Sequence, residues 1–276
     1  MASESTRRQV ADRLHIAERD RAPIAPLGTT HPDLSVADAY MIQQLNLERR
    51  LADGARLIGR KVGLTSAPMQ QMLGVDEPDY GVLLDDMLIE EGDDIDLGRL
   101  IEPRVEAEIA FLMGDDLAGP GASAVAAAHA VAGAMPALEI IDSRIAGWKI
   151  TLTDTVADNA SSALLVLGGR VTPVRALDLR LLGTTISRNG VHVDSGAGAA
   201  VLGNPLRCVA WLANKLSAFG ASLRAGDIVL AGALHRAIPV RDDDVIRAEF
   251  AHLGAVTARF APAPSPAVAA PEPAHA

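Results

Sequence analysis

The sequence predicts an α+β protein in which N-terminal helices cap a domain built on a curved mixed β-sheet. Residues 4–22 place apolar side chains at helical spacing among charged ones, as in an amphipathic helix. From Leu57 onward, short β-branched runs are separated by Gly, Pro and Asp, which is typical of strands joined by turns. Hydrophobic residues make up 49% of the 276-residue chain and charged residues 22%, so the chain can bury a substantial core.

The helical cap is predicted to cover residues 1–55. Its first helix is followed by a link that contains three prolines, and proline disfavours continuation of a helix. Ser35 is a favourable N-cap for a second helix, because Asp38 follows three residues later near the positive end of the helix dipole. Gly54 then marks the C-terminal end of this helix.

The β-rich domain is predicted to span residues 56–261. Its expected strands share short apolar or β-branched runs bounded by turn residues, and they lie near 57–65, 101–113, 136–142, 161–167, 183–188, 191–194, 227–231, 245–250 and 255–260. Asn189 and Gly190 form a strong two-residue hairpin signal between two of these strands. The domain is therefore expected to contain a mixed sheet with tight turns.

Three helices are expected within this domain. A short one follows Ser66, an Ala-rich one covers 123–134, and a long one runs from Asn204 to Gly220, where Asn204 is the N-cap and a proline follows it. The Pro/Ala-rich tail, residues 262–276, is predicted to be disordered, because this composition cannot bury enough apolar surface to fold.

Composition and charge argue against several classes of function. The formal net charge is −10 and aromatic residues are only 3%, so a surface for nucleic acid is not expected. No run approaches the roughly 20 apolar residues that a membrane helix needs. The N-terminal segment lacks the apolar core of a secretory signal, and the single cysteine, Cys208, cannot form an internal disulfide. A cytoplasmic location is therefore expected.

Two carboxylates lie two residues apart in a predicted strand. Glu106 and Glu108 project from the same face, because side chains alternate along a strand. A solvated sheet face is the ordinary explanation for such a pair. However, the strand continues as the apolar run IAFLM, and Glu139 lies in a second apolar strand, PALEII. Three converging carboxylates without a His or Cys pattern indicate either a salt-bridge network or a site for Mg²⁺ or Mn²⁺.

Lys61 lies in the predicted strand LIGRKVGLT, with Gly59 and Gly63 on the same face. Glycine in a strand commonly marks the close approach of a ligand or another backbone, so Lys61 is a candidate site residue. The alternative is an ordinary solvated lysine beside a bend of the sheet. Two polar segments, VDEPDYG and DTVADNASS, fit turn and capping chemistry and identify no site by themselves.

Six motifs occur in order along the chain: IGRKVGLTSAPMQQMLGVDEPDYGVL, IEPRVEAEIAFLM, MPALEIIDSRI, DTVADNASS, GAGAAVLGNP and WLANKLSAFGASLRAGDIVLAG. Together they resemble the 2-keto-4-pentenoate hydratases, which belong to the fumarylacetoacetate hydrolase superfamily. The resemblance runs from about Ala25 to Phe260. It implies a catalytic domain with a mixed β-roll and a divalent ion bound by carboxylates.

The resemblance also implies roles for individual residues. The family's metal ligands match Glu106, Glu108 and Glu139. Its active-site lysine and the acidic residue of its D-x-P-D-[FY]-G stretch match Lys61 and Asp79. Its D-N-A-S stretch, which is expected to line the substrate pocket, matches Asp158, Asn159 and Ser161.

The implied activity is metal-dependent addition of water to 2-hydroxypenta-2,4-dienoate, giving 4-hydroxy-2-oxopentanoate in the meta-cleavage catabolism of aromatic compounds. The related 4-oxalocrotonate decarboxylases are similar in the metal ligands and in GAGAAVLG, so decarboxylation is an alternative, although GRKVGL and WLANKL favour the hydratase. A non-catalytic subunit that supports a partner decarboxylase or aldolase is a third hypothesis. The family resemblance further implies a homo-oligomer, and AGALHRAIPV departs from its pattern, which leaves the length of the substrate's far end open.

Overall fold

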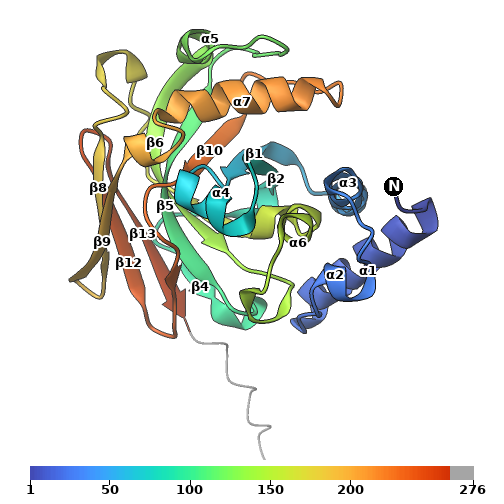
Figure 1. Cartoon of the computed structure of the whole chain (residues 1–276). Helices are drawn as coiled ribbons and strands as arrows, with labels where there is room; N and C mark the ends of the chain where they lie inside the picture. Colours follow the sequence, from blue (N-terminus) through green and yellow to red (C-terminus); the bar gives the residue numbers. More distant parts are fainter. Residues whose placement is uncertain (262–276) are drawn as a thin grey trace, which may run out of the picture.

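The N-terminal helices form a layer beside the sheets of the computed structural model, which describes residues 1–261 (Figure 1). This layer contains α1 (Glu4–Asp20), α2 (Leu27–Thr30) and α3 (Val36–Ala52). Helices α1 and α3 pack against each other. Ser35 and Asp38 form a capping box at the start of α3, so the predicted start of this helix is confirmed. Asp38 also accepts a hydrogen bond from Arg7 of α1, which ties the two helices together.

A mixed sheet forms the centre of the molecule. Its strands follow the order β2-β1-β10-β5-β6-β7-β3, and β11 pairs with β5. The pairs β1 with β10 and β3 with β7 are parallel, and the other pairs are antiparallel. The strands of this sheet are β1 (Leu57–Gly63), β2 (Asp79–Leu84), β3 (Leu88–Ile89), β5 (Arg104–Met113), β6 (Val131–Ile141), β7 (Ser162–Leu167), β10 (Ile228–Ala233) and β11 (Ile238–Pro239).

A second sheet packs against the first and lies on the left in Figure 1. Its order is β4-β13-β12-β8-β9. Its strands are β4 (Asp94–Asp96), β8 (Gly183–Arg188), β9 (Val191–Ala197), β12 (Val245–Phe250) and β13 (Gly254–Ala261). Phe111 of β5 and Phe260 of β13 are buried in one hydrophobic core, which the two sheets share. Asn189 and Gly190 both have positive φ and form the predicted hairpin turn between β8 and β9.

Four further α-helices and six 3₁₀ turns lie among the described residues. The α-helices are α4 (Ala67–Leu73), α5 (Ala124–Ala130), α6 (Leu152–Ala157) and α7 (Pro205–Ser217). Single 3₁₀ turns occur at η1 (Asp85–Met87), η2 (Leu97–Arg99), η3 (Ala146–Trp148), η4 (Asn159–Ser161), η5 (Val174–Ala176) and η6 (Gly198–Ala200). The predicted N-cap of α7 is confirmed, because the Asn204 side chain accepts a hydrogen bond from the backbone of Leu206.

Some predicted elements differ from the structure. Residues 131–134 were expected to continue the Ala-rich helix, but they begin β6, where Val131 pairs with Met113 of β5. The apolar run shows no period that separates helix from buried strand, so pairing with β5 decides its conformation. Strand β2 and helix α6 were not predicted. The tail that was expected to be disordered, 262–276, lies outside the described residues.

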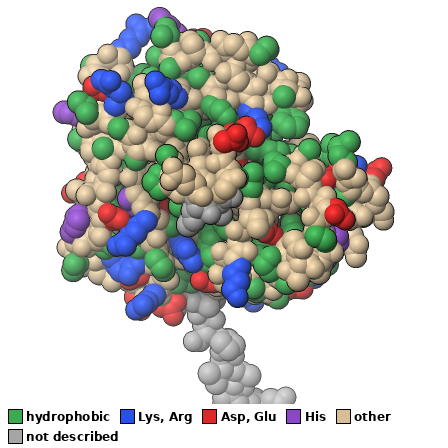
Figure 2. Space-filling model, in the orientation of Figure 1, with side chains coloured by type: hydrophobic (Ala, Val, Ile, Leu, Met, Phe, Trp, Pro, Cys, Tyr) green, Lys and Arg blue, Asp and Glu red, His purple; other side chains and the backbone are tan. Residues whose placement is uncertain are grey.

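Figure 2 shows one face of the molecule, on which basic, acidic and apolar side chains are interspersed. None of the helices in the described part of the chain has the length and hydropathy needed to cross a membrane.

Candidate active site beside a buried lysine

Three glutamates meet on the central pair of strands in the larger sheet. Glu106 of β5 is the direct cross-strand partner of Glu139 of β6, and Glu108 follows on the same face of β5. One carboxylate oxygen from each residue lies within 4.8 Å of the others. The structure therefore brings together the three carboxylates that the sequence singled out.

These carboxylates are withdrawn from solvent and only partly satisfied by the protein. Glu108 is 1% exposed and Glu139 is 0% exposed, whereas Glu106 is half-buried. Oε1 of Glu139 accepts a hydrogen bond of 2.7 Å from Ser162 Oγ, and Oε2 of Glu108 accepts one of 2.7 Å from the backbone of Gly232. Oε2 of Glu139 is buried and has no hydrogen-bond partner among the described residues. The nearest cation to this oxygen is the Lys61 ammonium at 3.4 Å. Three carboxylates outnumber this single positive charge, so the cluster can accept a further cation.

The electrostatics of the cluster also favour a cation. Burial raises the pKa of Glu106 to about 7, and the nearby Glu139 carboxylate adds to the shift. Burial likewise raises the pKa of Glu108 well above its ordinary value, with Glu139 and Glu106 contributing. Like charges this close oppose ionisation of one another. An all-oxygen donor set of this kind fits Mg²⁺, Mn²⁺ or another hard divalent ion.

Lys61 lies on β1 next to the glutamates and is 4% exposed, so it is not the solvated lysine of the alternative interpretation. Its Nζ is 3.4 Å from Oε2 of Glu139 and donates a hydrogen bond of 2.9 Å to the backbone oxygen of Ala160. Burial by itself lowers the pKa of Lys61, but the carboxylates of Glu139 and Asp79 outweigh burial, so the pKa is raised above its ordinary value. Lys61 is therefore a cation at neutral pH.

Asp79 begins β2 opposite Gly63 of β1 and is 2% exposed. Its Oδ2 is 3.5 Å from Thr155 Oγ1 of α6, and its Oδ1 has no hydrogen-bond partner among the described residues. Burial raises the pKa of Asp79 above its ordinary value. A Cβ atom at Gly63 would lie 2.2 Å from Asp79 Oδ1, so this glycine is where the Asp79 carboxyl approaches the β1 backbone. At Gly63 the close approach is therefore made by a side chain. At Gly59 it is made by another backbone, as predicted, because a Cβ there would lie 2.0 Å from the Ile228 oxygen of β10.

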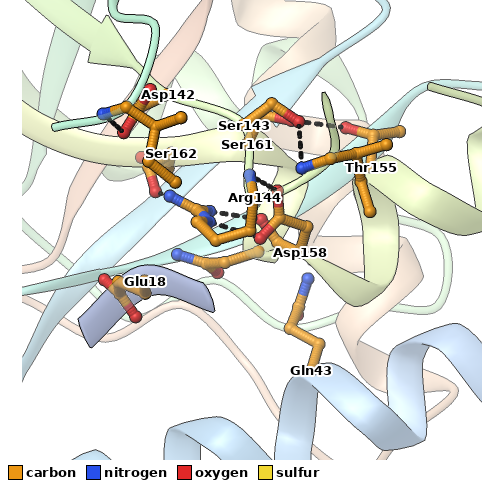
Figure 3. Close-up of polar contacts among 12 residues, drawn as sticks. Glu18, Gln43, Asp142, Ser143, Arg144, Thr155, Asp158, Ser161 and Ser162 are labelled. Carbon is orange, nitrogen blue, oxygen red and sulfur yellow. Dashed lines mark hydrogen bonds and ion pairs between the residues drawn. The ribbon is translucent and has the colours of Figure 1, made fainter. Parts of the chain in front are cut away.

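The turn η4 connects α6 to β7 and carries the residues predicted to line the substrate pocket. Asp158, just before the turn, forms a buried ion pair with Arg144 (Figure 3). Asn159 bonds with its side chain to both backbone groups of Val82. Ser161 Oγ is 3.5 Å from Thr155 Oγ1. The side chains of Asp158 and Asn159 are thus already bound to Arg144 and Val82, while the backbone of the turn accepts a hydrogen bond from Lys61.

Three consecutive residues of η4 have left-handed backbone angles: φ is 53° at Asn159, 51° at Ala160 and 55° at Ser161. None of them is glycine, and each left-handed residue of this kind costs roughly 1–2 kcal/mol. Such strain persists only where surrounding contacts enforce it, and it is concentrated at functional sites.

Sequence reasoning assigned no role to Arg144 or Thr155. Arg144 is 4% exposed and lies three residues after the end of the apolar strand β6, and a charge so close to a buried strand is a signal that could have identified it. Arg144 also lines a cavity of about 120 Å³ between η4 and the helical layer. Figure 3 shows Glu18 of α1 and Gln43 of α3 on the helical side of this region. Gln43 donates hydrogen bonds to backbone oxygens of β2 and α6, which anchors the helical layer to the wall of the site.

The family model for the fumarylacetoacetate (FAA) hydrolase C-terminal domain matches residues 54–261. The chain is 48% identical over 254 residues to a 2-keto-4-pentenoate hydratase of Paraburkholderia xenovorans (strain LB400), an alignment that covers 92% of this chain and 94% of the relative. It is 45% identical to a 2-hydroxyhexa-2,4-dienoate hydratase of Comamonas testosteroni, covering 84% of this chain and 89% of the relative.

Among solved structures, the chain is similar to 4-oxalocrotonate decarboxylase from Pseudomonas putida G7 complexed with magnesium and adipate. The TM-score is 0.92 at 37% sequence identity, and the superposition covers 94% of this chain and 99% of the other. The predicted α+β class, with curled mixed sheets and an N-terminal helical segment, is thereby confirmed. On the family match and these relatives, the chain belongs to the fumarylacetoacetate hydrolase family.

Proposed function

We propose that this protein is a hydro-lyase that adds water to 2-hydroxypenta-2,4-dienoate and forms 4-hydroxy-2-oxopentanoate, a step in meta-cleavage catabolism of aromatic compounds. The observation that carries the proposal is the buried ammonium of Lys61 beside the three-glutamate cluster, in a chain 43–48% identical to hydratases over at least 90% of its length. An anionic substrate needs a locally positive group in a protein of net charge −10. The Lys61 ammonium, together with a divalent ion held by the glutamates, would supply it.

The proposed cofactor is Mg²⁺ or Mn²⁺, held by Glu106, Glu108 and Glu139. The convergence of three carboxylates, which the single ammonium of Lys61 does not neutralise, supports it. The related decarboxylase was crystallised with magnesium and, in another structure, with calcium. When bound, such an ion acts as a Lewis acid that draws negative charge toward the substrate's 2-oxygen.

The reaction requires two proton movements that this chain can serve. The 2-hydroxyl loses its proton and C5 gains one, which gives 2-oxopent-3-enoate. Water then forms a bond to C4, and one of its protons ends on C3. We assign Lys61, a cation at neutral pH, to binding the substrate's developing negative charge. We assign the proton on water to Asp79, because burial raises the pKa of this carboxyl toward the working range of a general acid or base.

A substrate pocket beside these groups is proposed to be lined by the η4 segment, which contains the predicted residues Asp158, Asn159 and Ser161. Ser161 is the one whose hydroxyl faces Thr155, and Thr155 in turn approaches Asp79. We therefore expect Ser161 to be the member of this group that touches substrate.

Decarboxylation of 4-oxalocrotonate is the second candidate, because the structural similarity to a decarboxylase extends over 94% of the chain. A purely supporting subunit is less consistent with the buried lysine and glutamates.

Analysis of the reaction product distinguishes hydration from decarboxylation and from the absence of activity. Freshly generated 2-hydroxypenta-2,4-dienoate is followed by its ultraviolet absorbance, with and without EDTA, and the product is identified. Metal-dependent formation of 4-hydroxy-2-oxopentanoate is expected, whereas carbon dioxide released from 4-oxalocrotonate without hydration would support the decarboxylase.

We further propose that residues 56–261 form the catalytic unit and residues 1–55 a helical cap, since every proposed site residue lies in the former range. A cytoplasmic homo-oligomer, with a decarboxylase or aldolase as pathway partner, completes the proposal. The buried, free Cys208 suits a reducing compartment. Sedimentation velocity of the purified chain tests its association, and a monomer at micromolar concentration would contradict the homo-oligomer.

A further inference from the structure

The left-handed turn η4 controls the position of two groups in the site. Its central residue, Ala160, offers its backbone oxygen to Lys61 Nζ at 2.9 Å. Ser162, which follows the turn directly, donates from Oγ to Oε1 of Glu139 at 2.7 Å. Lys61 and Glu139 themselves form an ion pair at 3.4 Å. A small rotation of the turn would therefore move both the ammonium and one of the carboxylates.

Arg144 binds this turn on the side that faces the helical layer (Figure 3). Its Nη2 donates to the backbone oxygens of Asp158 at 2.8 Å and Ser162 at 3.3 Å, which are the residues on either side of the turn. Its Nε donates to the Asp158 carboxylate, which also accepts a bond of 2.9 Å from the Arg144 backbone. The guanidinium thus bridges the beginning and the end of the strained segment.

Asn159 binds the same turn from the side of β2. Its Nδ2 donates to the Val82 oxygen at 3.0 Å, and its Oδ1 accepts from the Val82 nitrogen at 2.8 Å. This is the paired pattern that a neighbouring strand would make. Gly81 allows the approach, because a Cβ at that position would lie 2.4 Å from the Asn159 backbone oxygen.

We propose that Arg144 and Asn159 are positioning residues, which hold η4 in its left-handed conformation so that Ala160 and Ser162 fix Lys61 and Glu139 for metal binding and catalysis. The inference rests on the proposed metal-dependent function. It gives Asp158 a supporting role as the counter-ion that orients Arg144. Neither Arg144 nor Asn159 contacts the reacting groups in this account, and both act through the backbone between them.

The chemistry of Arg144 explains why another cation would not suffice. A planar guanidinium presents several donors in a fixed fork, so it can bind a carboxylate and two backbone oxygens at once. A lysine ammonium keeps the charge but cannot span the same acceptors in one plane. Substitution of Arg144 by lysine therefore removes the bridge while it retains the ion pair with Asp158.

The test compares Arg144→Lys and Asn159→Gly with the unaltered protein by calorimetric titration of Mn²⁺ into metal-free samples. Glycine adopts left-handed angles without strain, so Asn159→Gly removes only the side-chain link to β2. Each variant is expected to bind Mn²⁺ about 10- to 100-fold more weakly and to lose a similar factor in kcat, as is usual when groups that support a metal ligand are removed. Arg50→Lys is the matched control, because Arg50 lines the same cavity but pairs with Glu18 and Asp86 rather than with η4.

Thermal unfolding of each sample shows whether a weaker affinity for Mn²⁺ comes from loss of positioning or from a general loss of stability. Variants that unfold at lower temperature but bind Mn²⁺ with unaltered affinity below that temperature would overturn the proposal. If Arg144→Lys does not fold, Asn159→Gly decides, since it leaves the Arg144 ion pair intact. An unaltered protein that binds Mn²⁺ but does not hydrate the dienoate would refute the proposed function alone, and the affinities would still test the turn. An unaltered protein that binds no Mn²⁺ would contradict both.

Discussion

Two strands of this protein carry almost the same pattern and use it in opposite ways. In β12 the segment Arg247-Ala248-Glu249 places its two charged side chains on an exposed face, where they pair with each other at 3.2 Å. In β5 the segment Glu106-Ala107-Glu108 directs two like charges toward Glu139, in the interior. Alternation along a strand therefore determines which side chains share a face. The elements packed against that face determine whether its side chains are exposed to solvent or meet in the interior.

The largest effect should come from neutralising one of the buried glutamates. Glu108→Gln removes a carboxylate from the proposed metal site, and loss of several kcal/mol of charge stabilisation corresponds to roughly a 1,000-fold fall in kcat/KM. Glu249→Gln on β12 removes only an exposed pair and should stay within about twofold. Steady-state hydration kinetics at saturating Mn²⁺ make the comparison. Equal losses in the two variants would refute the distinction between the strands.

The buried cation should matter almost as much as its carboxylates. Lys61→Met keeps the length of the side chain but removes the ammonium beside Glu139, and we expect kcat to fall by about 100- to 1,000-fold, the usual range when one group that stabilises developing charge is removed. Arg247→Met is the matched control, because it removes an exposed cation on β12. Near-normal turnover of Lys61→Met would remove this residue from the mechanism.

Metal binding should stabilise the protein more strongly at higher pH. The folded state holds the pKa of Glu106 near 7 and that of Glu108 above its ordinary value. The contribution of these two groups to the stability of the metal-free protein is therefore fully present below their unfolded pKa and is lost as pH rises through their folded pKa. A bound ion removes this repulsion, and its binding displaces the protons.

At about 100 times the dissociation constant, Mn²⁺ adds about 2.7 kcal/mol, or an increase in Tm of roughly 5–10 °C for a chain of this size. At one fixed concentration of free Mn²⁺, we expect differential scanning calorimetry to show a larger increase at pH 8 than at pH 6, because protonation of the glutamates raises the dissociation constant at the lower pH. An increase that is independent of pH would indicate that the ion binds elsewhere.

The smallest of these effects should come from two glycines. Gly63→Ala forces a Cβ to within 2.2 Å of Asp79 Oδ1, so the carboxyl must move, and we expect about a tenfold loss of kcat with a destabilisation of roughly 1–3 kcal/mol. Gly190→Ala at the β8–β9 turn, where φ is 79°, should cost roughly 1–2 kcal/mol and leave kcat unchanged. Chemical denaturation of both variants measures the free energy of unfolding, and steady-state kinetics measure kcat. A Gly63→Ala enzyme with full activity would show that Asp79 tolerates displacement.

The sequence predicted the glutamate cluster because each carboxylate stands in an apolar strand where an unpaired charge is unexpected. It also predicted the capping box of α3 and the Asn189-Gly190 turn, since these depend on residues close together in the chain. It could not predict that Asp79 begins a strand: VDEPDYG has the composition of a turn, and the pairing of Asp79 with Gly63 is a long-range contact. The role of Arg144 was also hidden, because the acceptors it bridges lie 14 to 18 residues away.

Glu106, Glu108 and Glu139 are proposed to form one divalent-metal site that the hydration reaction requires. The most direct measurement is calorimetric titration of Mn²⁺ into metal-free protein and into the Glu139→Gln variant, with dienoate hydration assayed on the same samples. We expect one high-affinity ion per chain, activity that appears when Mn²⁺ is added, and loss of both in Glu139→Gln. Hydration that persists in metal-free protein, or unaltered Mn²⁺ affinity in Glu139→Gln, would contradict this proposal.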